Sequence, residues 1–171
     1  MVGQRHLYVL ALGSNRSLSA TLTPRRLLEE AASLIGSKAD LLATAPLFDS
    51  APLGPSLRRY ANSALLIEST LTPPAMLAFV QGVEARLGRR RHRRWGARTM
   101  DIDIILWSGG TWSSRTLAIP HPAFRARAFV LDPARTIVPD WRDPYTGLAV
   151  RHLHARLQKA KAKVDHRPRR H

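Results

Sequence analysis

The order of strand-like and helix-like segments along the chain is the strongest constraint on its fold. The apolar run 7–12 predicts a buried strand, which a turn at Gly13-Ser14-Asn15 ends. Thr23-Pro24 and Thr72-Pro73 each precede apolar residues at helical spacing, which predicts two helices. Further strand-like segments are residues 41–50, 60–70 and 99–107. This order predicts an α+β fold, a ferredoxin-like βαββαβ core with extra strands and helices in a single three-layer domain.

The length of 171 residues suits one domain. We expect it to span residues 1–158 and to end in an amphipathic helix over 148–158, with residues 159–171 forming a basic, disordered tail. Five prolines between 120 and 144 predict a mostly irregular stretch with short helices. The chain has no cysteine, and neither a signal peptide nor a membrane span is visible in it. We therefore expect a soluble, cytoplasmic protein.

The positive charge is concentrated in two segments. The net charge is +15, of which residues 86–98 contribute +7 through seven arginines without an acidic residue. Residues 151–171 contribute another +7, since eight lysines and arginines accompany one aspartate. The rest of the chain is therefore almost neutral at +1. Such a distribution indicates an anionic ligand at the first segment, whereas the second segment fits a solvated tail.

Two aspartates directly follow the arginine-rich segment. Asp101 and Asp103 lie in an expected strand, so their side chains share one face about 7 Å apart. Ile102, Ile104 and Leu106 are expected to point the other way, into the core. Carboxylates bind magnesium, and arginines bind phosphate oxygens through paired hydrogen bonds. Together the two groups predict a site for a metal-bound polyphosphate.

Other interpretations of these charges remain open. A D-x-D pair is common on the polar face of a half-buried strand, and an arginine run alone is more often a solvated face or a nucleic-acid patch. A nucleic-acid-binding protein would use residues 86–98 and the tail on phosphate backbones, but Asp101 and Asp103 would repel them unless metal-bound. A fold relative without catalysis is a further alternative. The chain has no P-loop motif and no G-x-G-x-x-G after a strand.

A second group of residues has the chemistry to bind a flat heterocycle. The proline-rich segment 48–55 precedes Tyr60 and Asn62, and an asparagine amide both donates and accepts hydrogen bonds. From these residues alone, Tyr60 as a core residue and Asn62 as a strand-start residue is the favoured interpretation. His121 lies between two prolines, where it is either a turn histidine or a phosphate contact.

Taken together, these segments resemble the 6-hydroxymethyl-7,8-dihydropterin pyrophosphokinase family. The resemblance spans roughly residues 7–158. The most specific motif is R-W-G-x-R-T-x-D-x-D, at residues 94–103. The other matching stretches are Ala11-Leu12-Gly13-Ser14-Asn15, Ser50-Ala51-Pro52-Leu53-Gly54, Tyr60-Ala61-Asn62, Pro120-His121-Pro122 and Arg127-Ala128-Phe129-Val130-Leu131.

The resemblance implies an enzyme of folate biosynthesis. Such an enzyme transfers pyrophosphate from ATP to the hydroxymethyl group of the pterin and releases AMP. Two magnesium ions would be held by Asp101 and Asp103. The partners would be these small molecules, with neither a membrane nor an obligate nucleic acid, and the protein would act as a monomer.

The resemblance also implies roles for individual residues. The catalytic residues would be Asp101, Asp103, Arg89 and Arg98. The ATP-binding residues would be Gln81, Glu84, Arg89, Arg91, Arg94, Arg98, Ile104, His121 and Arg127, with Gln81 and Glu84 off the apolar stripe of their helix. The pterin-binding residues would be Ser50, Ala51, Leu53, Tyr60, Asn62, Trp95 and Phe129. Trp95 and Phe129 would stack on the two ring faces, and Asn62 would bind the ring edge.

Overall fold

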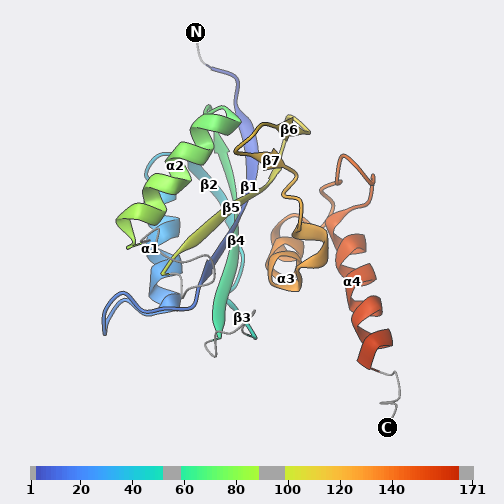
Figure 1. Ribbon diagram of the computed structural model, residues 1–171. Coiled ribbons are helices and arrows are strands. Elements are labelled where there is room, and N and C mark those ends of the chain that lie inside the picture. The colour runs from blue at the N-terminus through green and yellow to red at the C-terminus, as the bar shows by residue number, and fades with distance from the viewer. Residues whose placement is uncertain (1–2, 52–58, 89–98, 166–171) are drawn as a thin grey trace.

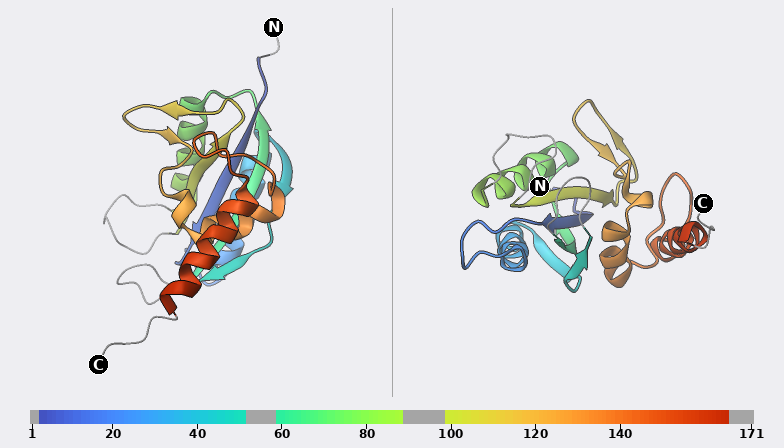
Figure 2. Two further views of the ribbon diagram at one scale, coloured as in Figure 1. Left: turned by 90° about the vertical axis from the view of Figure 1, so that its right-hand side faces the viewer. Right: turned by 60° about the horizontal axis from the view of Figure 1, so that its bottom comes forward.

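The computed structural model describes residues 3–51, 59–88 and 99–165, and it has three layers (Figure 1). Helices α1 and α2 cover one face of a central sheet, and α3 and α4 lie on the other side (Figure 2). The strands of this sheet are β1 (His6–Ser14), β2 (Asp40–Thr44), β3 (Phe48–Ser50), β4 (Tyr60–Ser69) and β5 (Asp101–Trp107). The helices are α1 (Pro24–Gly36), α2 (Pro73–Arg86), α3 (Ala128–Ile137) and α4 (Val150–Asp165), with a 3-10 turn η1 (Phe124–Ala126).

The order of strands in the sheet confirms the predicted ferredoxin-like core. It runs β2-β4-β1-β5, with every pair antiparallel, and β3 also pairs with β4. The chain thus passes from β1 through α1 to β2, and from β4 through α2 to β5. Proline stands at the start of α1 and of α2. Its fixed φ suits a helix, and the N–H that it lacks would have no acceptor within the first turn. Both predicted helix starts are therefore confirmed.

Each face of the sheet has its own hydrophobic core. On the first face, Leu10, Leu12 and Ile102 pack with residues of α1 and α2 such as Leu28 and Val80. On the second face, Val9 and Ala11 belong to a cluster that also contains residues of α3 and α4. Successive residues of β1 alternate between the two clusters because side chains along a strand alternate in direction. The sheet is therefore buried on both sides over much of its area.

A bulge in the β1–β5 pairing corrects the expected orientation of Leu106. Val9 pairs with Leu106 but Leu10 pairs with Ile104, so Ile105 is an extra residue in β5. Ile102 and Ile104 pack toward α1 and α2 as expected, whereas Ile105 and Leu106 both belong to the cluster on the α3 side. The expectation that Leu106 shares a face with Ile102 and Ile104 was wrong, because it assumed unbroken alternation.

The C-terminal half differs from the sequence expectation in two places. Helix α4 continues to Asp165, seven residues beyond the expected end at residue 158, so much of the expected tail segment is helical. The lysine and alanine residues of 159–163 have high helix propensity, which accounts for the extension. A small hairpin of β6 (Trp112–Ser113) and β7 (Ala118–Ile119) was not predicted, because two-residue strands leave no periodic signal.

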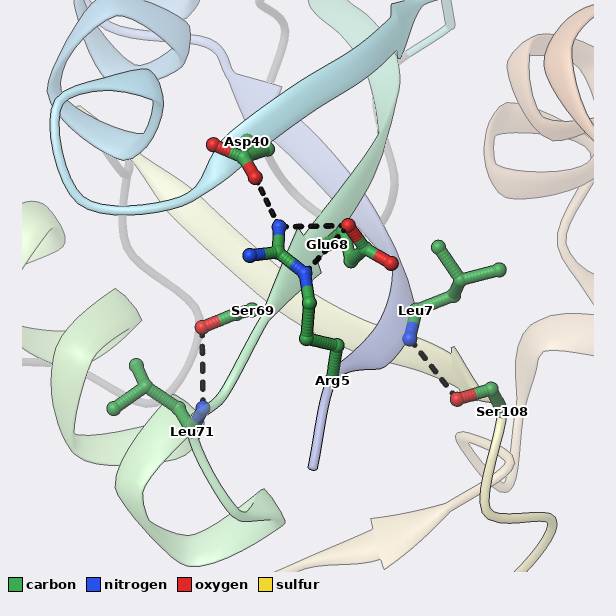
Figure 3. A network of polar contacts seen from close by, with 7 residues as sticks. All are labelled: Arg5, Leu7, Asp40, Glu68, Ser69, Leu71 and Ser108. Atoms are coloured by element: carbon green, nitrogen blue, oxygen red, sulfur yellow. Dashed lines mark hydrogen bonds and ion pairs between the residues drawn. The ribbon is translucent and has the colours of Figure 1, made fainter. Parts of the chain in front are cut away.

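A polar network fastens the end of the sheet where β1 begins (Figure 3). Asp40 and Glu68 are cross-strand partners in β2 and β4, and Arg5 forms ion pairs with both. The guanidinium thereby relieves the repulsion between two opposed carboxylates. Glu68 and then Asp40 raise the pKa of Arg5 through hydrogen bonds. The other end of the sheet, where Gly13 pairs with Asp101, holds the polar residues of the predicted site.

Within the described ranges, no helix has the length and apolar character that a membrane crossing requires.

Candidate functional site

The two aspartates of β5 lie on the face of the sheet that also carries α3. Asp101 pairs with Gly13 and Asp103 pairs with Ala11 across the β1–β5 ladder. Both aspartates are half-buried, while Ile102 between them is buried in the opposite core. The predicted shared orientation of the two carboxylates is confirmed. Gly13, beside Asp101, has no side chain, and Ala11, beside Asp103, is buried in the core on the α3 side.

Asp103 faces two of the residues that the resemblance assigned to ATP. The Nε2 atom of His121 lies 3.8 Å from Oδ2 of Asp103, and Nη1 of Arg127 lies 3.9 Å from the same oxygen. The three residues come from β5, from the segment after β7 and from the start of α3. The structure therefore brings together a carboxylate, an imidazole and a guanidinium that are separated by up to 24 positions in the sequence.

The backbone holds the His121 ring in one orientation. The N–H of His121 donates to the carbonyl of Ile105 at 3.0 Å, which ties this segment to the outer edge of β5. The N–H of Ala123 donates to Nδ1 of His121 at 3.2 Å. In the neutral ring the proton therefore sits on Nε2, the nitrogen that faces Asp103. His121 is thus oriented toward an anion at the site.

Across β1 from Asp101 lies a second polar group, centred on Asn62. Asn62 is only 2% exposed and pairs with Gly13, while Gly13 also pairs with Asp101. The amide and the Asp101 carboxylate are thus about 10 Å apart, two strand spacings, on one face. Asn62 Nδ2 donates to Ser50 Oγ at 2.7 Å. An added Cβ on Gly13 would come within 3.4 Å of Asn62 Oδ1, so glycine allows the amide to lie over β1.

Tyr60 and Phe129 add aromatic surface near these groups. Tyr60 precedes Asn62 by two positions in β4, so both side chains share one face of the strand, and Tyr60 is half-buried rather than a full core residue. Phe129 is half-buried in the first turn of α3, and the Arg127 guanidinium lies 5.6 Å from its ring centre. Arg127 therefore contacts both the acidic group at Asp103 and the aromatic ring of Phe129.

Glu84 does not lie where the sequence placed it. It was expected off the apolar stripe of α2, with Gln81, but it is 2% exposed and grouped with the buried residues Met76, Val80 and Val83. Its Oε1 accepts a hydrogen bond from the Ile102 N–H at 2.7 Å. Gln81 is exposed, as expected. The hydrogen bond to β5 explains why a carboxylate occupies a buried position of the helix.

The Ile104 side chain points away from the predicted ATP site, and its ATP-binding role stays a prediction. Its side chain is 3% exposed and lies in the core on the α1 and α2 face, away from Asp103. A contact between the Ile104 side chain and a nucleotide on the Asp103 face is therefore not supported. Ala51, at the end of the described segment after β3, is exposed.

Several predicted site residues lie outside the described ranges. They are Leu53, Arg89, Arg91, Arg94, Trp95 and Arg98.

Asp101 and Asp103 fit a magnesium ion that is bound partly by the protein and partly by a second molecule. Among the described residues, no three His, Cys, Asp or Glu side chains group closely enough to form a protein-only metal cage. Magnesium ordinarily binds one or two carboxylates and completes its octahedron with water and phosphate oxygens. Asp101 and Asp103, half-buried and on one face, supply that set of oxygen donors.

Sequence reasoning missed a buried ion pair that supports the site. Arg125 Nε and Nη2 donate to the Asp143 carboxylate at 2.6 and 2.5 Å. Burial alone raises the pKa of Asp143, but hydrogen bonds from Arg125, Thr146 and the Tyr145 N–H outweigh it and hold that pKa below its usual value. The pair anchors η1, which separates His121 from Arg127. The i and i+18 spacing gives no local sequence signal.

Fold and site together define a ferredoxin-like α+β protein that carries an acidic and cationic site at one end of its sheet. Residues 9–139 match the family model for 7,8-dihydro-6-hydroxymethylpterin-pyrophosphokinase. The chain belongs to this family.

Curated relatives carry the corresponding name. The chain is 40% identical over 105 residues to the 2-amino-4-hydroxy-6-hydroxymethyldihydropteridine pyrophosphokinase of Pseudomonas aeruginosa, covering 61% of this chain and 65% of the relative. It is 31% identical over 159 residues to the Bacillus subtilis protein of that name, covering 91% and 92%. For the Synechocystis and Methylorubrum extorquens proteins, the match spans only 53% and 51% of their length.

Solved structures agree on the fold. A Plasmodium falciparum HPPK-DHPS mutant with SDX-DHP superposes with a TM-score of 0.76 at 14% identity, covering 96% of this chain and 46% of that chain. This likeness shows the ferredoxin-like arrangement that the sheet order also gives.

Proposed function

We propose that the protein transfers pyrophosphate from ATP to the hydroxymethyl group of 6-hydroxymethyl-7,8-dihydropterin, releasing AMP, in folate biosynthesis. The observation that carries this proposal is the position of Gly13, which is flanked on one face of the sheet by Asp101 and by Asn62. One side supplies ligands for a metal-bound phosphate, and the other supplies an amide for a heterocycle edge. Family membership and the names of the relatives support the same reaction.

Asp101 and Asp103 would hold the magnesium that ATP carries, and two ions would satisfy both carboxylates and the triphosphate. Bound magnesium supplies neutralisation of phosphate charge during the displacement. Both carboxylates project from one strand, so their spacing is set by the β5 backbone rather than by flexible loops. Rigid placement of the ligands lowers the cost of organising the site at the moment of reaction.

The nucleotide side of the site would be cationic. His121 and Arg127, which both face Asp103, would contact phosphate oxygens of the nucleotide. Arg89, Arg91, Arg94 and Arg98 would bind the remaining phosphate charge, with Arg89 and Arg98 acting in catalysis. Gln81, exposed on α2, would border the nucleotide.

The pterin side would combine an edge contact with stacking. Asn62 would bind the ring edge through its amide, which both donates and accepts hydrogen bonds and already donates one to Ser50. Phe129 would stack on one ring face and Trp95 on the other, with Leu53 and Tyr60 beside them. Ser50 and Ala51 would line the same pocket.

The reaction would need no nucleophile from the protein. The pterin hydroxyl oxygen forms a bond to the β-phosphorus, and the bond from that phosphorus to the oxygen bridging to the α-phosphorus breaks. AMP leaves with the bridging oxygen and its electron pair, and the hydroxyl proton passes to solvent. The chain's residues orient the two substrates for this in-line displacement and stabilise the charge that shifts between the phosphates.

We also propose that the enzyme acts as a monomer in the cytoplasm on these small molecules, without an obligate nucleic acid. Residues 159–171 would lie outside the catalytic part of the chain.

The proposal is tested by product identity. Purified protein is incubated with ATP and magnesium, with and without the hydroxymethyl pterin, and nucleotides are separated chromatographically. The proposal requires AMP that forms only with the pterin, in a one-to-one ratio to the pterin pyrophosphate ester. Formation of ADP, or release of AMP irrespective of the pterin, would refute it.

A further inference from the structure

The backbone of β5 lies at an edge of the sheet, where one of its N–H groups requires a partner from outside the sheet. Among the described strands, β5 pairs with β1 alone. Glu84 of α2 provides the missing acceptor, because its Oε1 lies 2.7 Å from the Ile102 nitrogen. The bond satisfies a buried backbone donor, and leaving such a donor without an acceptor would be costly.

The residue that receives this bond has a special position. Ile102 lies between Asp101 and Asp103, the two carboxylates assigned to the metal-bound nucleotide. Its side chain is fixed in the core on the α1 and α2 face, and its N–H is fixed by Glu84. The residue between the two aspartates is thus held both by its side chain and by its backbone N–H.

Glu84 reaches this peptide from the face opposite the site. Helix α2 covers one face of the sheet (Figure 1). Ile102 points to this face, whereas Asp101 and Asp103 point to the face carrying α3. Burial to 2% exposure disfavours an isolated carboxylate, so the side chain occupies this position at a desolvation cost. Core packing alone would be served better by leucine or methionine at that position, which indicates a role for the acceptor.

We propose that Glu84 is a positioning residue. It fixes the backbone at Ile102, so that Asp101 and Asp103 keep the spacing needed to bind a metal-bound nucleotide. The inference rests on the proposed function and replaces the direct ATP contact expected for Glu84. Groups that orient metal ligands from behind alter metal affinity or activity by roughly 10- to 100-fold when removed.

Three substitutions separate positioning from direct contact. Glu84→Gln keeps an acceptor of the same length, Glu84→Ala removes it, and Glu84→Asp keeps the carboxyl group but withdraws it by one methylene. Glu30→Ala, which removes an exposed carboxylate from α1, is the matched control. Each variant is first checked for folding by its thermal unfolding midpoint, and Glu84→Asp and Glu84→Gln remain informative if Glu84→Ala does not fold.

Two measurements that do not depend on turnover read out the proposal. The first is hydrogen exchange of the Ile102 amide by NMR, relative to other β5 amides. The second is the manganese concentration that half-saturates the protein in the presence of α,β-methylene-ATP, followed by electron paramagnetic resonance. Pterin-dependent AMP formation by the wild-type protein tests the proposed function separately.

The proposal requires Glu84→Gln and Glu30→Ala to keep Ile102 protection and manganese affinity near those of the wild type. Glu84→Asp and Glu84→Ala should lose protection selectively at Ile102 and require roughly 10- to 100-fold more manganese. Unchanged manganese affinity in Glu84→Asp despite lost protection would overturn the proposal. Weakened nucleotide binding in Glu84→Gln with Ile102 protection intact would overturn it too, in favour of direct contact.

Discussion

Arg127 Nη1 lies 3.9 Å from Asp103 Oδ2, while the same guanidinium lies 5.6 Å from the ring centre of Phe129. Arg127 thus connects the acidic group of β5 with an aromatic ring at the start of α3. At this distance from Asp103 the guanidinium is available to approach an anion that binds between them. The arrangement predicts that Arg127 acts mainly on ATP.

We expect Arg127→Met to reduce kcat/KM for ATP by about 10- to 100-fold, the value of a hydrogen bond to a charged group. The KM for the pterin should change much less, because methionine retains an apolar contact with Phe129. Steady-state kinetics with each substrate varied in turn measures both effects. Arg135→Met, which removes an exposed arginine from α3, is the control. An equal rise in KM for ATP and in KM for the pterin would contradict a role specific to ATP.

Asn62→Ala should act on the other substrate. Removing the amide that lies across Gly13 from Asp101 is expected to raise KM for the pterin by roughly 10-fold or more, because a heterocycle edge then lacks its partner. ATP affinity should stay within about two-fold, since no charge is removed. Ser63→Ala removes the neighbouring hydroxyl, which bonds to the Ala45 carbonyl, and should affect stability alone. A selective rise in KM for ATP in Asn62→Ala would be inconsistent with the assignment.

The Arg125–Asp143 pair predicts a specific pH dependence of stability. Because the Asp143 pKa is lowered in the folded protein, its stabilising contribution is fully present above the unfolded pKa of about 4. That contribution decreases as the pH falls through the lower folded-state pKa. Asp143→Asn should lower the unfolding free energy by about 2–3 kcal/mol at pH 7, somewhat less than a fully buried pair because Arg125 retains some exposure.

The measurement is urea unfolding between pH 3 and pH 7. The difference between wild type and Asp143→Asn should be constant at neutral pH and become smaller toward pH 3. A difference that grows as the pH falls would show that the carboxylate is destabilised in the folded state.

Two glycines give a matched pair of stability predictions. A Cβ on Gly109 would clash with the Trp107 ring, so Gly109→Ala must displace a large side chain. We expect a loss of about 1–3 kcal/mol. Gly82 lies inside α2 with nothing within 4 Å of an added Cβ, so Gly82→Ala should stabilise by about 0.5–1 kcal/mol. Thermal unfolding measures both; a stabilising Gly109→Ala would show that Trp107 moves without cost.

The sequence predicted those parts of the fold and site that depend on local periodicity. Apolar residues at helical spacing after Thr23-Pro24 and Thr72-Pro73 predicted α1 and α2, and the two-residue repeat of a strand predicted the shared face of Asp101 and Asp103. The bulge that turns Leu106 to the other core depends on how β1 and β5 pair, which no single strand encodes. Polarity likewise misplaced Glu84, because its partner is a backbone N–H eighteen positions away.

The most direct test of the account compares pterin-dependent AMP formation by the wild type, Asp101→Ala and Asp103→Ala at saturating ATP and magnesium. We expect steady AMP formation by the wild type and at least about 100-fold less by each variant, as for loss of a group that stabilises the transition state. Unfolding midpoints are measured in parallel, so that lost AMP formation is scored only in variants that are folded at the assay temperature. Variants that form AMP at the wild-type rate would contradict the account.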